Sequence, residues 1–70
     1  CLIEFGKFIK EGRLNRDMYQ EEVAALVGIS QSYLSYIERG SKDRNIDLVL
    51  ALKICQVLRL DLNDFIKKYM

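Results

Sequence analysis

The side chains of this sequence that could take part in chemistry are hydrogen-bonding groups rather than catalytic ones. Four of them are predicted to share one polar, unhindered helix face: Gln31, Ser32, Ser35 and Tyr36. Amides and hydroxyls donate and accept hydrogen bonds, so this face suits recognition of a polar partner. Beside it, residues 39–44 carry three basic side chains against the single acid Asp43. These groups predict a binding surface.

Catalytic and metal-binding chemistry is poorly represented. The 70 residues include no histidine, which is the commonest general base and metal ligand. No nucleophile has a base beside it, no phosphate-binding loop is present, and the carboxylates show no pairing. Two cysteines without a histidine do not complete a four-ligand zinc site. We therefore expect no enzyme activity, no cofactor, no metal and no small-molecule ligand.

Length and charge bound the possibilities further. A chain of 70 residues corresponds to one domain, and half of its residues are hydrophobic. The formal net charge of +1 by itself argues against a nucleic-acid partner, which normally goes with a basic domain. Four acids, however, are predicted in the first turns of helices, where they complement the helix dipole: Glu21, Glu22, Asp61 and Asp64. Residues 39–44 therefore form a basic patch that the average charge conceals.

The cellular setting is predicted from the cysteines and the apolar runs. Cys55 lies in an apolar run and is expected in the core, and two thiols do not make a disulfide framework. No apolar stretch approaches the roughly 18 residues of a membrane span. We expect a cytoplasmic protein with no membrane partner. Because the sequence starts at Cys1 rather than Met, we also expect a processed or truncated chain.

Five short helices are predicted, because the sequence has no proline and no strand-like alternation. They are expected from residue 2 to a polar break at 15–17, from 19 or 20 to 27, at 31–39 and 47–58, and from 62 onwards. Gly12 should weaken the end of the first helix, and Gly28 and Gly40 should end the second and third. Ser30 and Asp61 are suitable N-caps for the helices that follow them.

The fourth helix is unusually apolar. One broad face is formed by Leu48, Ala51, Leu52, Cys55 and Leu58, and five more apolar side chains surround it: Ile46, Val49, Leu50, Ile54 and Val57. A helix that is apolar on most of its surface is normally buried on several sides. We therefore expect this helix to be buried on several sides.

Residues 20–40 have the pattern of a helix-turn-helix, in which two helices of about eight residues meet at a tight turn. Ala24 is small where the two helices approach most closely, and Gly28 can adopt the backbone conformation of the turn. Apolar side chains occupy the positions that must pack on a core: Val23, Val27, Ile29, Leu34 and Ile37. Because all these features occur together at the spacing expected along residues 20–40, the sequence predicts a helix-turn-helix.

With these residues in place, the sequence resembles the lambda-repressor-like, or XRE/Cro-type, family of DNA-binding domains over nearly its whole length. The most specific matches are Gln20, Ala24, Gly28, Ser30, Ser35, Ile37, Glu38 and Gly40, and the first helix adds Gly6, Ile9 and Arg13. The spacing of six apolar residues matches the last two helices of the family: Leu48, Leu52, Ile54, Leu58, Leu60 and Phe65. The resemblance implies an all-α, compact five-helix bundle in which residues 1–70 form one helix-turn-helix domain.

The same resemblance implies site residues. The helix after Ser30 would lie in the major groove of double-stranded DNA, with Gln31, Ser32, Ser35 and Tyr36 toward the bases. Glutamine pairs with adenine and serine with any base, while Tyr36 suits a thymine methyl or a phosphate. Phosphate contacts are implied for Gln20, Arg39, Ser41, Lys42 and Arg44. Arg13 and Glu38 match positions that form a buried ion pair in relatives.

Two features depart from the family pattern. Tyr19 replaces the serine or threonine that usually caps the second helix, so either Asp17 caps a longer helix or Tyr19 itself faces the DNA backbone. Ile46 and Arg59 replace the proline before the fourth helix and the glycine near its end. The phosphate contacts of Gln20 and of the loop after Gly40 depend on these positions.

The leading functional hypothesis is a sequence-specific transcriptional regulator, a repressor, that binds a palindromic operator as a homodimer. The predicted dimer surface consists of Ile46, Leu50, Leu60, Leu62 and Ile66. The alternative is a protein-interaction or antitoxin-like module that keeps the fold without binding an operator. Such a module should show acidic or strongly apolar residues on the face of Gln31, where this sequence is polar.

Overall fold

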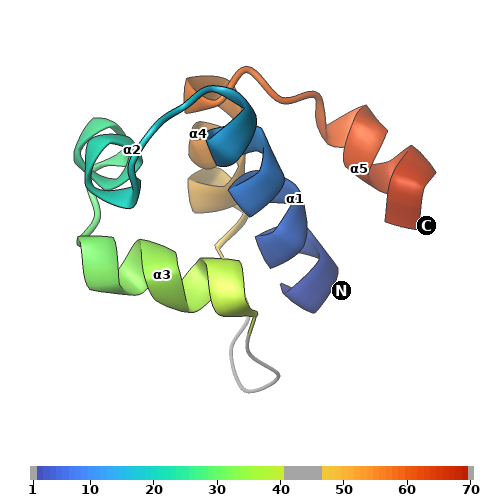
Figure 1. Ribbon diagram of the computed structural model, residues 1–70. Helices are drawn as coiled ribbons and strands as arrows, with labels where there is room; N and C mark the ends of the chain where they lie inside the picture. Colours follow the sequence, from blue (N-terminus) through green and yellow to red (C-terminus); the bar gives the residue numbers. More distant parts are fainter. Residues whose placement is uncertain (1, 41–46, 70) are drawn as a thin grey trace.

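The computed structural model describes residues 2–40 and 47–69, and within those ranges it consists of helices without strands (Figure 1). The helices are α1 (Leu2–Asn15), α2 (Gln20–Val27), α3 (Gln31–Arg39), α4 (Leu48–Val57) and α5 (Leu62–Tyr69). The predicted all-α fold of five helices is confirmed. The bounds of α2 and α3 agree with the expectation, because the local signals of Gly28 and Ser30 determine them.

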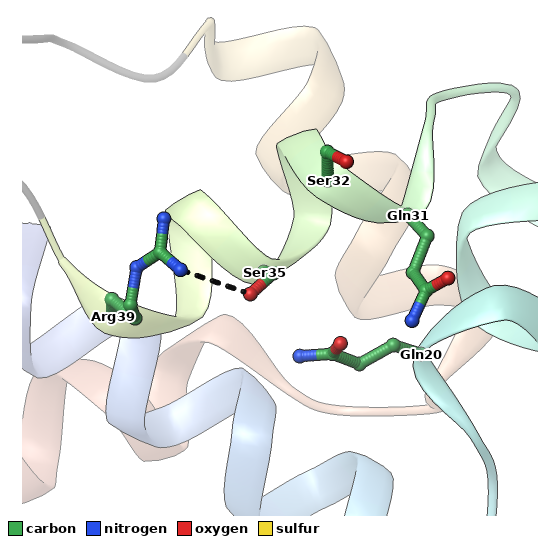
Figure 2. Close-up of a pocket in the computed structure, with 5 residues that line it drawn as sticks. All are labelled: Gln20, Gln31, Ser32, Ser35 and Arg39. Carbon is green, nitrogen blue, oxygen red and sulfur yellow. Dashed lines mark hydrogen bonds between the residues drawn. The ribbon is translucent and has the colours of Figure 1, made fainter.

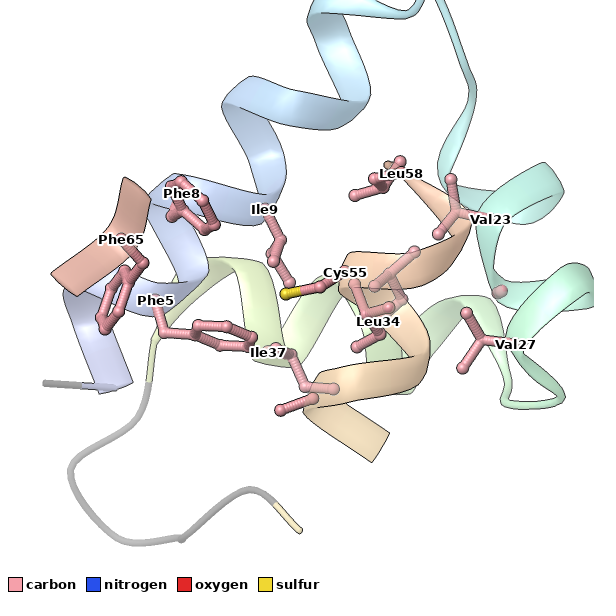
Figure 3. Packing of buried hydrophobic residues seen from close by; sticks show 13 residues of the cluster. Phe5, Phe8, Ile9, Val23, Val27, Leu34, Ile37, Cys55, Leu58 and Phe65 are labelled. Atoms are coloured by element: carbon pink, nitrogen blue, oxygen red, sulfur yellow. The ribbon is translucent and has the colours of Figure 1, made fainter. Parts of the chain in front are cut away.

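The centre of the core is built from one or two side chains of each of the first four helical segments. The side chains that are less than 2% exposed are Ile9, Val23, Leu34, Ile54 and Leu58. Figure 3 shows Ile9, Val23, Leu34 and Leu58 between the first four helices, with Cys55 of α4 among them. Burial of these side chains from water is the main source of stability in a domain of this size.

Aromatic rings attach α5 to α1 at one end of the core. Phe65 of α5 lies with its ring centre 5.6 Å from that of Phe5 and 5.4 Å from that of Phe8 (Figure 3). The Phe5–Phe65 pair meets edge to face, the arrangement that aromatic quadrupoles favour. At the start of α5, the Asp61 carboxylate accepts a hydrogen bond of 2.9 Å from the Asn63 backbone N–H and caps the helix as predicted.

The close approach of α1 to α3 depends on Gly6. A Cβ atom at this position would overlap the carbonyl oxygen of Ile37 and lie 2.7 Å from that of Glu38. The backbone of α1 therefore contacts the last turn of α3 directly. This contact places the C-terminal half of α3 against α1 and leaves the opposite side of α3 toward solvent.

The predicted burial of the fourth helix on several sides is wrong. Ala51, Ile54 and Cys55 are buried, but other apolar side chains of α4 are largely in solvent: Leu48 is 66% exposed, Val49 59% and Leu52 47%. The core lies on one side of α4, where it packs against α2. Nothing in residues 2–40 and 47–69 covers the side that carries Leu48, Val49 and Leu52.

The end of α1 agrees with the expectation. The helix includes Gly12 and ends at Asn15, and the Leu60 side chain packs where a Cβ of Gly12 would stand, with its Cδ1 atom 2.6 Å from that position. The polar break follows, and there Asp17 has a left-handed φ of 54°. In the described part of the chain, none of the helices has the length and apolar character needed to cross a membrane.

Candidate nucleic-acid interface

The turn between α2 and α3 is closed by backbone hydrogen bonds. Gly28 has a φ of 91°, a left-handed value that glycine adopts without steric cost. The N–H groups of Gly28 and Ile29 both donate to the carbonyl oxygen of Ala24, at 2.8 and 3.0 Å. Ser30 then caps α3, because its Oγ accepts from the Tyr33 N–H at 3.1 Å. The segment is a helix-turn-helix, as the spacing predicted.

The two sides of α3 have opposite character. Leu34 and Ile37 are buried in the core, whereas Gln31 and Ser32 are exposed and Ser35 is half-buried. Figure 2 shows an open depression between α2 and α3 that is lined by Gln20, Gln31, Ser32, Ser35 and Arg39. Arg39 is exposed and its Nη1 atom donates to Ser35 Oγ at 3.4 Å. Three predicted base contacts and two predicted phosphate contacts thus share one polar surface.

Tyr36, the fourth predicted base contact, lies apart from this depression. It is half-buried, and its ring stacks on that of Tyr33 with the ring centres 6.5 Å apart and an angle of 15° between the planes. Tyr33 itself packs against the core. The tyrosine pair therefore lies elsewhere on α3 and does not line the depression.

A buried ion pair connects the first helix to the end of α3. Arg13 Nε donates to Glu38 Oε2 at 2.8 Å, and Arg13 Nη2 donates to Glu38 Oε1 at 3.0 Å. The two residues are only 8% and 6% exposed. Arg13 Nη1 also donates to the carbonyl oxygen of Met18 at 2.9 Å, just before α2. The pair predicted for these positions is present, and it places a cation beside the buried carboxylate.

The start of α2 excludes one of the two alternatives for Tyr19, a longer helix capped by Asp17. The Tyr19 phenol makes no capping hydrogen bond and is 71% exposed, while its backbone N–H donates to Glu22 Oε1 at 3.0 Å. Glu22 therefore makes the half of the capping box that needs no serine or threonine at position 19. Asp17 lies in the turn before α2 and does not extend the helix, which begins at Gln20.

The sequence did not predict one contact of the site. Gln20 Nε2 donates to Glu38 Oε1 at 3.0 Å, so the amide expected at a phosphate is also bonded to the buried ion pair. The two residues are 18 positions apart, and no local pattern joins them. Only the packing of α2 beside the last turn of α3 brings them together.

Comparison with known proteins identifies the family. A family model described as helix-turn-helix matches residues 9–65, which is most of the chain. The chain belongs to this helix-turn-helix family. Its lambda-repressor-like resemblance is thereby confirmed, and the family consists of DNA-binding regulators rather than enzymes.

Solved structures of helix-turn-helix proteins share the fold. The restriction-modification controller protein C.AhdI from Aeromonas hydrophila is 34% identical, with a TM-score of 0.79 over 91% of this chain and 94% of that one. The wild-type controller protein C.Esp1396I is 28% identical, with a TM-score of 0.79 over 96% and 86%. The clp gene regulator ClgR from Corynebacterium glutamicum, at 23% identity and a TM-score of 0.84 over 93% and 67%, shows the fold alone. A search of curated proteins finds no match.

Some predicted site residues of this helix-turn-helix protein lie outside the described residues. These are Ser41, Lys42 and Arg44 of the phosphate set and Ile46 of the dimer set. The remaining dimer candidates Leu50, Leu60 and Leu62 are partly buried against the core, and Ile66 is 46% exposed. In the described ranges, no three His, Cys, Asp or Glu side chains are grouped to hold a metal ion.

Proposed function

We propose that this helix-turn-helix protein is a sequence-specific regulator of transcription, a repressor, that inserts α3 into the major groove of double-stranded DNA. The observation that carries the proposal is the surface of α3 opposite Leu34 and Ile37. That surface is polar and open, and Gln20 and Arg39 stand at its two borders. A helix that is fixed by its apolar side and presents amides and hydroxyls on the other can read base edges.

The side chains divide into two roles. Gln31, Ser32 and Ser35 read bases, with the Gln31 amide suited to the paired donor and acceptor of adenine. Tyr36, which stacks on Tyr33, lies on the same helix and contacts a thymine methyl or a phosphate. Gln20 and Arg39 bind phosphates, which fix the position of α3 without reading sequence. Ser41, Lys42 and Arg44 extend the phosphate contacts along the backbone.

The active form is a homodimer on a palindromic operator. A single α3 contacts few base pairs, and a two-fold dimer places two such helices one turn of DNA apart. The dimer surface comprises Ile46, Leu50, Leu60, Leu62 and Ile66, of which Ile66 is exposed in the described structure. The similarity to restriction-modification controller proteins supports a regulator that acts in the cytoplasm of a prokaryotic cell.

The decisive experiment is selection of binding sites from a random pool of double-stranded DNA, followed by titration at several salt concentrations. We expect enrichment of a palindromic motif and an affinity that falls steeply with salt, because phosphate contacts release counterions. A promoter that overlaps the motif should then lose transcription when the protein is added.

The competing function is a protein-interaction module that uses the exposed apolar side of α4, where Leu48, Val49 and Leu52 lie. If folded, dimeric protein enriches no motif, the regulator proposal is wrong. Gln56→Ala, which alters an exposed residue of α4, serves as the control variant in the selection, because it should enrich the same motif as the wild type.

A further inference from the structure

One oxygen atom connects the buried ion pair to the polar surface of α2 and α3. Glu38 Oε1 accepts a hydrogen bond from Arg13 Nη2 and another from Gln20 Nε2, each 3.0 Å long. Glu38 is 6% exposed, whereas Gln20 is half-buried and lines the depression on the surface. Gln20 therefore bridges an interior carboxylate and the surface that faces solvent.

The chemistry of this bond determines how the Gln20 amide is turned. An ionised carboxylate only accepts hydrogen bonds, so the nitrogen of the amide must face Glu38 and the oxygen must face elsewhere. The second N–H of the same nitrogen remains available at the surface. Figure 2 shows the Gln20 side chain extended alongside the part of α3 that carries Gln31 and Ser35.

The ion pair of Arg13 and Glu38 does not need the hydrogen bond from Gln20. Arg13 already engages both carboxylate oxygens of Glu38, so Glu38 is neutralised without Gln20. A glutamine side chain that is free in solution loses rotamer freedom when it binds a partner, and prior ordering reduces that loss. The bond to Glu38 thus orders Gln20 before a ligand arrives.

We propose that Glu38 is a positioning residue for DNA binding, which holds the Gln20 amide in one orientation so that its second N–H donates to a DNA phosphate. This role rests on the proposed function. Glu38 itself touches no DNA and acts through Gln20. The same carboxylate thereby couples the junction of α1 and α3 to the first turn of α2.

The first test measures side-chain amide order by ¹⁵N relaxation in the DNA-free wild-type protein. We expect the Gln20 amide to be as ordered as the backbone, and that of Gln56, an exposed glutamine of α4, to be mobile. In Glu38→Asp, which keeps the charge for Arg13 but shortens the reach, the Gln20 amide should become as mobile as that of Gln56. A Gln20 amide that is mobile in the wild type would overturn the role without using any variant.

The second test is a double-mutant cycle on the selected operator. Gln20→Ala should weaken binding about tenfold in the wild type and less than about threefold in Glu38→Asp, because the amide is no longer ordered there. An equal loss in both backgrounds, with backbone spectra showing folded protein, overturns the positioning role alone. Failure of the folded wild-type protein to bind any DNA would overturn this role together with the proposed function.

Discussion

Arg13 of α1 and Glu38 of α3 meet through two hydrogen bonds, from Nε to Oε2 at 2.8 Å and from Nη2 to Oε1 at 3.0 Å. They are 25 residues apart in sequence and nearly inaccessible to solvent. All buried side-chain nitrogen and oxygen atoms of the described residues have a hydrogen-bond partner. The pair is thus the main polar junction between the first helix and the helix proposed to read DNA.

Removing one member of this pair should be severely destabilising. Arg13→Ala leaves the Glu38 carboxylate buried without its cation, and such a change costs about 3–5 kcal/mol. That is comparable with the whole stability of about 3–5 kcal/mol expected for one core of this size. We therefore expect the variant to be largely unfolded at 25 °C in circular dichroism. Lys68→Ala, which removes an exposed partner of Glu11, should unfold in urea like the wild type; equal behaviour of both variants would refute the prediction.

Binding measurements should distinguish residues that contact bases from residues that contact phosphates. Gln31→Ala should lose about 1–3 kcal/mol of affinity for the selected operator and relax the preference at one base pair of each half-site. Arg39→Ala should weaken binding to all sequences alike and reduce the salt dependence. Competition assays with operator and scrambled DNA at two salt concentrations test both. A uniform loss for Gln31→Ala would mean that Gln31 does not read bases.

The end of α4 offers a stabilising substitution. Arg59 has a φ of 54°, a left-handed value that costs a non-glycine residue about 1–2 kcal/mol. Arg59→Gly should relieve this cost and, after the greater freedom of glycine in the unfolded chain is subtracted, raise stability by about 0.5–1 kcal/mol. Arg59→Ala removes the same side chain but keeps the Cβ, so it should give no gain. Urea unfolding of the three proteins measures the difference, and equal midpoints for both variants would exclude the backbone explanation.

Burial raises the pKa of the Cys55 thiol above its ordinary value of 9.0. The unfolded chain therefore releases this proton at a lower pH than the folded protein does. The stability from the protonated, buried thiol is complete below the unfolded pKa and is lost as the pH rises from about 9 through the folded pKa. Stability measured in urea between pH 8 and pH 10.5 should fall more steeply for the wild type than for Cys55→Ala. Parallel curves would contradict the prediction.

Local signals account for the part of the fold that was predicted well. Gly28 and Ser30 define the turn between α2 and α3 through backbone conformation and a single capping bond, both of which depend on neighbouring residues. The alternation of core and polar positions along α3 follows from the same helical period. The family match from residue 9 to residue 65 agrees with this register.

The predicted burial of α4 on several sides failed for an equally physical reason. Nearly every position of that helix is apolar, so no helical period distinguishes a buried side from an exposed one. Leu50 packs against the core, whereas Leu48, Val49 and Leu52 are largely exposed. Which of these side chains lies outside depends on how α2 packs against the helix.

The sequence by itself determined the five helices, the turn at Gly28 and the polar side of α3, because helix ends and helical periodicity depend on residues within a few positions of each other. Only the tertiary structure decided which apolar side of α4 is buried and that Gln20 bonds to Glu38. Those two features depend on how separate helices pack, and they are set by contacts between residues distant in the chain, such as the approach of α1 to α3 at Gly6.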